Sequence, residues 1–197
     1  VRGRVVAVSS VNPMSRPIFI AIILLIAVVG SVFRLQDLAE RPMHGDEAVN
    51  AAKLGETIEG RGYEYDPHEY HGPTLNYLTL IPSWLGGVGN FVELQEPILR
   101  VVPVVFGMLL VLIFLPIGDG LGRVASVFVA LFTAVSPAMV FYSRYFIHEM
   151  LLVFFTAGAI VCGYRYLKSP GILWASLVGV CLGLMHATKE TFVIALG

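Results

Sequence analysis

Long apolar runs separated by short polar segments organise most of this sequence. A first run covers residues 17–33, and four more cover residues 101–118, 124–142, 150–164 and about 172–187. A helix that crosses a bilayer needs roughly 17 to 25 mainly apolar residues, and these runs lie at or near the lower end of that range. The pattern predicts an all-α, polytopic transmembrane bundle of about five spans.

The first and second runs are separated by the long segment of residues 34–100. Residues 74–89 within it are also apolar, but their core has only about a dozen residues and contains Pro82, which is short for a span. We therefore expect an interfacial helix there, with Tyr77 and Trp84 at the level of the lipid headgroups. Residues 34–100 then form one long outer loop that carries juxtamembrane helices.

The composition agrees with a membrane protein and excludes some other classes. Of 197 residues, 56% are hydrophobic and 14% are charged, whereas soluble domains have about a quarter charged residues. The net charge of -1 comes without a basic stripe, which argues against nucleic acid as a partner. Cys162 and Cys181 both lie in apolar runs, so we expect packing residues rather than a disulfide or a metal pair.

The basic residues of the short connections predict the orientation in the membrane. If residues 1–16 form a cytoplasmic tail, the cytoplasmic side carries Arg2, Arg4, Arg16, Arg123, Arg165 and Lys168. The only acid on that side is then Asp119, and this agrees with the positive-inside rule. We predict an integral plasma membrane protein with a cytoplasmic N-terminus and an extracytoplasmic reaction face.

Two features of the ends extend this interpretation. No small-x-small cleavage site follows residues 17–33, so the first run is expected to be an uncleaved span rather than a signal peptide. The chain stops at Gly197 within an apolar stretch, where helix carbonyls would be left without partners. Residues 1–197 are therefore predicted to be the N-terminal part of one larger transmembrane domain.

Residues 42–73 are rich in acids and histidines. Asp46 and Glu47 open a predicted amphipathic helix that ends at Gly60 or Gly62, with Ala48, Ala51, Ala52, Gly55 and Ile58 on one side and Glu56 and Glu59 off it. One interpretation makes Asp46 an N-cap and Glu47 a first-turn acid. The other makes the pair a general base whose pKa is tuned by the neighbouring carboxylate.

A second cluster lies in the sequence DPHEYHG and contains Asp66, His68, Glu69 and His71. Histidines three positions apart, with an acid nearby, could bind a divalent metal. Pro67, Gly72 and Pro73 disfavour a helix, so a hydrogen-bonded loop at the water interface is the competing interpretation.

A third cluster, SRYFIHE at 143–149, places Arg144, His148 and Glu149 where a span begins. An acid at the mouth of a span is costly unless it has a partner, so such residues suggest function. An Arg144 to Glu149 ion pair that only orients the helix is the alternative. Lys189 could similarly be a snorkelling anchor.

Several of these motifs together resemble a known family. They are HGDEA at 44–48, HGPTLNYLTL at 71–80, LRVVPVVFG at 99–107, SPAMVFYSRYFIHEM at 136–150 and ATKE at 187–190. The set resembles the GT-C membrane glycosyltransferases, of the protein O-mannosyltransferase and aminoarabinose transferase type. More narrowly, it is similar to the flippase activity-associated proteins of prokaryotic protein glycosylation.

This resemblance implies roles for individual residues. Asp46 would be the catalytic base with Glu47 beside it, and Glu149 would match a second acidic position where family members often carry Asp. The donor would be a polyprenyl- or dolichyl-phosphate sugar, and the acceptor a hydroxyl of a protein or a glycolipid. The expected substrate-binding residues are Arg144 and Lys189 for the phosphate, together with His148, His71 and Tyr70.

Two other functions were weighed against this one. A non-catalytic membrane factor that binds lipid-linked glycans and assists their flipping would also use Arg144 and Lys189, but only an enzyme needs Asp46 as a base. A transporter with a midplane site is disfavoured because the spans carry almost no interior charge and no paired broken helices.

Overall fold

The computed structural model describes residues 14–66 and 71–196, and within these ranges every regular element is a helix. In chain order they are α1 (Arg16–Leu35), α2 (Gly45–Ile58), α3 (Thr74–Leu85), the 3-10 helix η1 (Phe91–Glu93), α4 (Glu96–Leu112), α5 (Arg123–Val135), α6 (Pro137–Ser143), α7 (Glu149–Lys168), α8 (Ile172–Thr188) and α9 (Phe192–Leu196). The all-α prediction is confirmed for this part of the chain.

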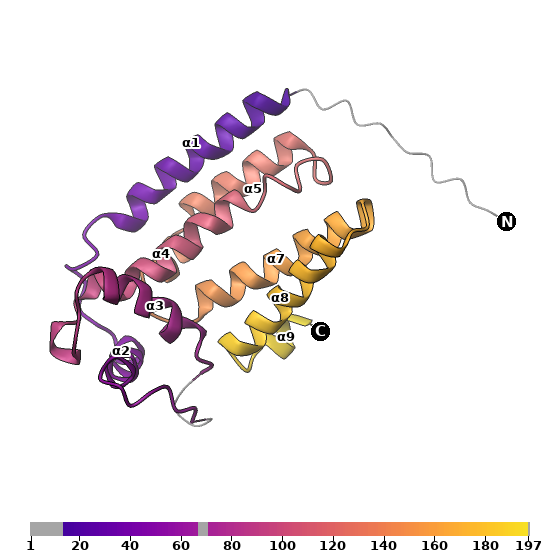
Figure 1. The fold of residues 1–197 in the computed structure, drawn as a ribbon. Coiled ribbons are helices and arrows are strands. Elements are labelled where there is room, and N and C mark those ends of the chain that lie inside the picture. Colours follow the sequence, from indigo (N-terminus) through magenta and orange to yellow (C-terminus); the bar gives the residue numbers. More distant parts are fainter. Residues whose placement is uncertain (1–13, 67–70, 197) are drawn as a thin grey trace.

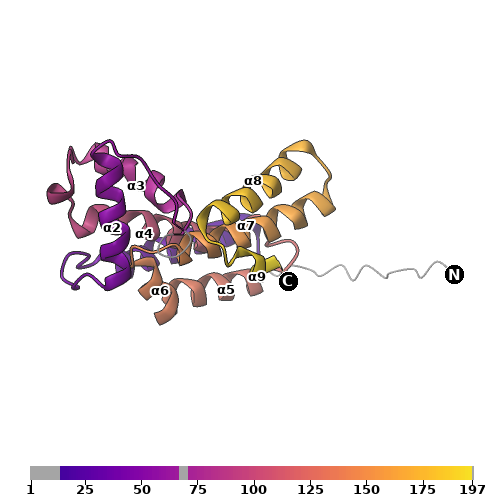
Figure 2. The ribbon, with the colours of Figure 1, turned by 90° about the horizontal axis from the view of Figure 1, so that it is seen from below.

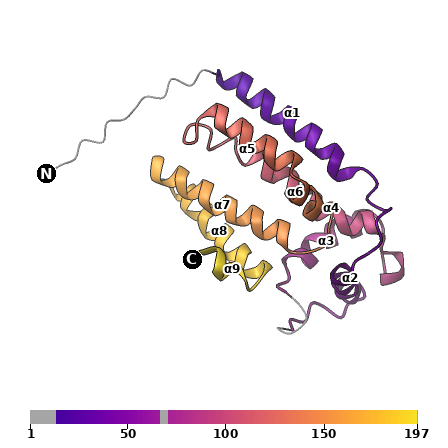
Figure 3. The ribbon, with the colours of Figure 1, turned by 180° about the vertical axis from the view of Figure 1, so that it is seen from behind.

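The long helices lie side by side, and the elements of the first loop gather at one end of them. Figure 1 shows α1, α4, α5, α7 and α8 as this bundle, with α2 and α3 beyond it. The same separation is visible from below and from behind (Figures 2 and 3). We call this end of the bundle the α2 end, and the other, which holds Asp119 in the connection between α4 and α5, the Asp119 end.

Each predicted apolar run is largely helical, the run at 124–142 as two helices, but among the described residues fewer helices than the expected five are long and apolar enough to span a membrane. Two helices, α1 and α7, are long and apolar enough to cross a membrane, and the bent pair of α5 and α6 makes a third if it is one span. The apolar helix α8 is shorter, with 17 residues. These helices indicate an integral membrane protein, while the predicted count of five spans is not confirmed.

The run at 124–142 is broken rather than continuous. α5 ends at Val135, α6 begins at Pro137, and their axes differ by 58°. Proline has no N–H to donate to the preceding turn, and it forces the residue before it, Ser136, into an extended conformation. The run predicted as one span over residues 124–142 is therefore divided into two helices, and its crossing of the membrane as one bent span stays a prediction.

Arg34 satisfies the carbonyl groups that this break exposes. Its guanidinium, which is fully buried, donates to Thr133 O at 3.0 Å and to Ala134 O at 2.8 Å. In an unbroken helix Thr133 O would accept from residue 137, which is a proline here. A side chain at the end of α1 thus replaces helical hydrogen bonds in α5.

Helix α2 is fixed at its start by a reciprocal cap. The N-cap is His44, whose Nδ1 accepts from the backbone N–H of Asp46, while its own N–H donates to Glu47 Oε2 at 3.2 Å. Asp46 stands in the first turn, so the interpretation of Asp46 as the N-cap was wrong. The helix ends at Ile58, before Gly60 at φ 85°, as the sequence predicts.

The buried face of α2 differs from the predicted one. Glu47, Ala51 and Leu54 are buried, whereas Ala48 and Ala52 are exposed. Ala51 and Leu54 belong to a core cluster that draws on α3, α4, α7 and the connection before α7. Residues 47, 51 and 54 follow helical spacing, so the packed stripe includes an acid.

Helix α3 is too short to cross a bilayer. Its 12 residues span about 18 Å at 1.5 Å per residue, against a hydrocarbon thickness of about 30 Å. Tyr77 and Trp84 are exposed, and α3 packs on α2, α4 and α8. Residues on both sides of α3 consequently remain at the α2 end of the bundle.

Candidate functional site

Glu47 is the most completely bonded acid of the α2 end. Its oxygens accept from Arg100 Nε and Nη2 at 2.9 and 3.0 Å, from Arg41 Nη2 at 2.8 Å, and from the backbone N–H of Phe146 at 2.9 Å. The cap bond from His44 adds a fifth donor. Burial raises the pKa of Glu47, but the hydrogen bonds from Arg100, Phe146 and His44 outweigh it, so the pKa lies below its usual value. With every acceptor direction used, this carboxylate holds α2 in place.

Asp46, one position earlier, has the opposite environment. Its side chain is 72% exposed, and the ring of His44 lies close to it, with Nδ1 at 3.9 Å from Oδ2. Consecutive helical residues point about 100° apart, so the two acids do not share a face. Asp46 and Glu47, predicted to act as a pair, therefore contact different groups. Of the two, only Asp46 has a carboxylate that solvent can reach.

Tyr145 connects the start of α2 with the neighbouring helix α6. Its ring centroid lies 5.5 Å from that of His44 and 5.4 Å from that of Phe141, on which it stacks. The guanidinium of Arg41 lies 4.5 Å from the same ring. Burial raises the pKa of Tyr145, and the charges of Asp46 and Glu47 raise it further. Asp46 therefore acts electrostatically on the ring that borders α6.

A cavity of about 430 Å³ lies beside this ring, between the end of α1 and α6. Its lining is mainly apolar with two arginines: Phe33, Gln36, Arg41, Val135, Pro137, Val140, Phe141 and Arg144. We call it the Arg144 pocket. The break at Pro137 turns α6 across the end of α5 and so shapes one wall.

Arg144 is held in this pocket by carbonyl oxygens. Its Nη2 donates to Gln36 O at 2.6 Å and to Asp37 O at 3.2 Å, both just beyond α1. Within the described ranges no carboxylate lies within ion-pair distance of Arg144. The alternative in which Arg144 pairs with Glu149 was thus wrong, and the positive charge of Arg144 remains uncompensated at the pocket.

Glu149 instead pairs with Lys189, with Nζ at 2.5 Å from Oε1. The second oxygen of Glu149, Oε2, is buried and has no hydrogen-bond partner in the described part of the chain. The side chain of Lys189 is 16% exposed and that of Glu149 38%, so only the lysine end of the pair is largely buried. The predicted phosphate ligands Arg144 and Lys189 therefore have different surroundings: one is uncompensated and the other is neutralised.

His148 is buried next to this ion pair. Its Nε2–H donates to Gly72 O at 3.1 Å, and its Nδ1 has no partner among the described residues. Burial lowers the pKa of His148 to about 4, and the nearby His71 contributes in the same direction. At neutral pH His148 is thus an uncharged donor that positions the 71–73 segment.

His71 and Glu190 close the cluster toward solvent. His71 Nδ1 lies 2.9 Å from Glu190 Oε2, its ring meets that of His148 edge-on at 5.2 Å, and Tyr65 Oη donates to Glu190 Oε1 at 3.0 Å. A cavity of about 450 Å³ adjoins Tyr65 and Glu190. Glu190 belongs to the ATKE motif, but neither Glu190 nor Tyr65 was predicted to be a site residue. The hydrogen bond that joins them connects residues 125 positions apart, and the sequence pattern does not show such a contact.

The metal prediction is only partly covered by the structure. His68 and Tyr70 lie outside the described residues, as does Glu69. Asp66 and His71 are described, and within the described ranges no group of three His, Cys, Asp or Glu is placed to hold a metal ion. Binding of a divalent metal by Asp66, His68 and His71 stays a prediction.

Arg41 and Arg100 are the important residues of the site that sequence reasoning missed. A signal was present, because Glu47 precedes Ala51 by four and Leu54 by seven positions and so falls on the apolar stripe of α2. A buried acid requires a buried cation. Arg100, within the apolar LRVVPVVFG, was the obvious partner to look for.

Comparison with known families decides the class of protein. The family model described as dolichyl-phosphate-mannose-protein mannosyltransferase matches residues 72–196, which is more than half of the chain. The chain belongs to this family. No individual curated protein matches the chain at a significant level.

Membership in this mannosyltransferase family agrees with the broader resemblance seen in the sequence. It identifies the protein as a helical membrane protein of a glycosyltransferase class that uses lipid-linked sugars. The matched range contains Arg144, His148, Glu149 and Lys189, whereas Asp46 and Glu47 precede it. The narrower, flippase activity-associated assignment stays a prediction.

Proposed function

We propose that this mannosyltransferase-family protein transfers a sugar from a polyprenyl-phosphate-linked donor to an acceptor hydroxyl on the extracytoplasmic face, with Asp46 as the general base. The observation that carries the proposal is the contact chain from the N-terminus of α2 to the Arg144 pocket. His44 lies beside Asp46 and Tyr145, and Tyr145 stacks on Phe141 in the wall of the pocket. An exposed carboxylate and an arginine without a described carboxylate partner therefore lie at the two ends of one chain of ring contacts.

The chemistry requires little more than these two groups. The acceptor oxygen attacks the anomeric carbon of the sugar, its proton passes to the Asp46 carboxylate, and the bond from that carbon to the phosphate oxygen breaks with its electron pair on the phosphate. The lipid phosphate is already a good leaving group. A cation near it stabilises the charge that develops as the bond breaks.

The Arg144 pocket offers contacts to both parts of the lipid donor, the isoprenoid chain and the phosphate. Val135, Pro137 and Val140 provide apolar walls for isoprenoid units next to the phosphate. Arg144 carries an uncompensated positive charge, and guanidinium groups bind phosphate oxygens with strong charge-assisted hydrogen bonds. Arg41 lines the same pocket and shares the single charge of Glu47 with Arg100, whereas Lys189 has Glu149 to itself and is not in this lining, so Arg41 is the better second ligand.

Glu149 fits a positioning role toward the acceptor. Its Oε2 is a buried acceptor without a partner in the described part of the chain, and its ion-pair partner Lys189 directly precedes Glu190, which lines the cavity beside Tyr65. A hydroxyl-bearing protein or glycolipid could donate to this oxygen. The flippase activity-associated assignment would place this acceptor in prokaryotic protein glycosylation.

The test is transfer of labelled sugar from a polyprenyl-phosphate donor by the full-length protein in membranes, comparing wild type with Asp46→Asn. We expect transfer by the wild type and loss of transfer in Asp46→Asn. Asp37→Asn is the matched control, because Asp37 is an exposed aspartate at the same end and its φ of 50° is a conformation that asparagine also adopts.

The outcomes separate the two functional classes. Full transfer by Asp46→Asn would remove Asp46 as the base. Absence of transfer by the wild type, with specific binding of the donor, would favour the non-catalytic factor that assists flipping of lipid-linked glycans.

A further inference from the structure

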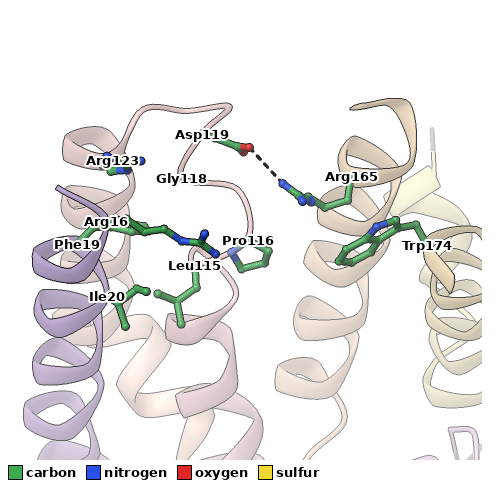
Figure 4. A pocket seen from close by; sticks show the side chains of 10 residues that line it. All are labelled: Arg16, Phe19, Ile20, Leu115, Pro116, Gly118, Asp119, Arg123, Arg165 and Trp174. Carbon is green, nitrogen blue, oxygen red and sulfur yellow. Dashed lines mark hydrogen bonds and ion pairs between the residues drawn. The ribbon is translucent and has the colours of Figure 1, made fainter. Parts of the chain in front are cut away.

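A second cationic cavity lies at the Asp119 end, far along the bundle from Asp46. It has a volume of about 450 Å³ and is lined by three arginines, Arg16, Arg123 and Arg165, against one acid, Asp119. Figure 4 shows it between α1 on one side and α7 and α8 on the other, with the connection from α4 to α5 behind it. None of these residues belongs to the proposed transferase site.

The positive charge of this cavity exceeds what its single acid can neutralise. Asp119 is engaged by Arg165 Nη1 at 3.2 Å and also by Lys168 Nζ and Tyr164 Oη. Arg123 Nη1 donates to Met14 O at 2.6 Å, a neutral carbonyl. The lining as a whole is consequently an anion-attracting surface.

Two of the arginines have donors available to a ligand. Arg16 makes no hydrogen bond and no ion pair in the part of the chain that the structure describes. Arg165 has a buried Nε that lacks a partner in the same part. In Figure 4 the two side chains point toward the space from opposite sides. In the described part of the chain Arg165 uses only Nη1, toward Asp119, so its Nη2 and the guanidinium of Arg16 are the donors left for a ligand oxygen in this space, whereas the buried Nε is not.

The floor of the cavity is built by close packing. A Cβ on Gly118 would lie 2.7 Å from the Phe19 ring, and a Cβ on Gly120 would lie 2.6 Å from the ring of Tyr164. The connection can therefore approach α1 and α7 only because both residues are glycine. This contact keeps Asp119 and Arg165 together and gives the cavity a defined shape.

The rim of the cavity is apolar, which narrows the class of ligand. Trp174 lies 5.4 Å from the Arg165 guanidinium and shares the lining with Phe19 and Ile20. Nearby Ile18 and Leu173 are 55% and 62% exposed. Tryptophan is typical of the headgroup level of a membrane protein, where an amphiphile places its charge next to its chains. A small free anion would leave this apolar rim unused.

We propose that this cavity binds the phosphate of an anionic glycerophospholipid, with Arg16 and Arg165 donating to the phosphate oxygens and the acyl chains lying along α1 and α8. A guanidinium group presents parallel N–H donors that match the oxygens of a phosphate. The orientation predicted from the basic residues places this end at the cytoplasmic leaflet, which is rich in anionic headgroups. The inference concerns a lipid site and does not depend on the transferase activity.

Trp174 supplies a direct probe of occupancy. Residues 1–197 contain two tryptophans, Trp84 and Trp174, and Trp84→Phe leaves Trp174 as the single reporter among them. The protein is reconstituted in phosphatidylcholine vesicles that contain a minor fraction of either brominated phosphatidylglycerol or brominated phosphatidylcholine. We expect stronger quenching of Trp174 by the anionic lipid. Equal quenching by the two lipids would overturn the proposal.

Variants separate a built site from general attraction to the surface. Arg16→Gln, at an exposed position that folding does not require, should reduce the excess quenching, and Arg16→Gln with Arg165→Gln should abolish it. The control Arg61→Gln removes an exposed arginine at the α2 end and should leave the excess quenching by the anionic lipid unchanged.

Two outcomes would contradict the proposal. If the double variant Arg16→Lys with Arg165→Lys kept the full excess quenching, charge alone would attract the lipid and the built site would be refuted. If inorganic phosphate removed the excess quenching of Trp174, the cavity would be a site for free anions, and the lipid assignment would be overturned.

Discussion

Arg100 donates two parallel hydrogen bonds to Glu47, from Nε to Oε1 at 2.9 Å and from Nη2 to Oε2 at 3.0 Å. Both side chains are only 1% exposed. This bidentate pair joins α2 to α4 and removes Glu47 from the solvent that Asp46 faces. Two adjacent acids thus have separate tasks, with Glu47 fixing the helix on which Asp46 stands.

Glu47→Gln should destabilise the protein, whereas Asp46→Asn should not. Removing one member of a buried ion pair leaves the other charge buried without compensation, which costs roughly 3–5 kcal/mol of unfolding free energy. Thermal unfolding of both variants in the same detergent measures this difference. Equal transition temperatures for Glu47→Gln and the wild type would refute the anchoring role of Glu47.

Arg144→Gln should raise the KM for the lipid-linked donor. The loss of a charge-assisted hydrogen bond to phosphate costs about 1.5–3 kcal/mol, which corresponds to a KM increase of about 10- to 100-fold. Steady-state kinetics with varied donor concentration measures it, and Arg61→Gln serves as the control. A lower kcat with an unchanged KM would instead assign Arg144 to holding the end of α1 through Gln36 and Asp37.

His148 should make stability depend on pH between about 6.5 and 4. Its pKa falls from the ordinary 6.5 to about 4 in the folded protein, so the unfolded chain binds more protons in this window. The contribution of His148 to the free energy of unfolding is fully present above about pH 6.5. It decreases as the pH falls toward about 4, by roughly 3 kcal/mol in total. Transition temperatures measured from about pH 7 to about pH 4 record this loss.

The control for this effect is His148→Gln, whose side-chain amide can also donate to Gly72 O. It should flatten the pH dependence in the upper part of the window, because carboxylates with lowered pKa values, such as Glu47 and Glu190, lose stability only as the pH falls through their ordinary value of 4.5 and below it. An unchanged slope in His148→Gln would assign the effect to other groups.

Arg34→Leu should destabilise the contact between α1 and α5. It leaves Thr133 O and Ala134 O without their donor, at roughly 1–3 kcal/mol for each buried group. Pro137→Ala would restore the N–H that Thr133 O lacks, so it should recover part of the loss in the Arg34→Leu background. A double-mutant cycle of transition temperatures tests this, and strictly additive effects would contradict the link between Arg34 and the break.

The positions of the helices, and the gathering of basic residues at the Asp119 end of the bundle, could be predicted from the sequence. The apolar runs reflect burial in lipid or in the bundle, and each is helical over most of its length, the run at 124–142 as two helices. Arg16, Arg123 and Arg165, grouped by the positive-inside rule, do line one cavity. Such features depend on composition over a whole segment, which is why pattern reasoning finds them.

The break at Pro137 and the function of Glu47 could not be predicted in the same way. The apolar pattern continues on both sides of Pro137, and a proline inside such a run can either kink or end a helix. The environment of Glu47 depends on Arg100 and Phe146, which lie 53 and 99 positions further along the chain. Only the packed fold brings these donors together.

The same contacts impose an order on the biosynthesis of this protein. Glu47 leaves the ribosome long before Arg100 and Phe146, and until both have followed, its carboxylate must remain hydrated, because burial without donors is too costly. Helix α2 can therefore dock only after the connection between α6 and α7 has been inserted. The surface that presents Asp46 is consequently completed only after α1, α4, α5 and α6 have been synthesised.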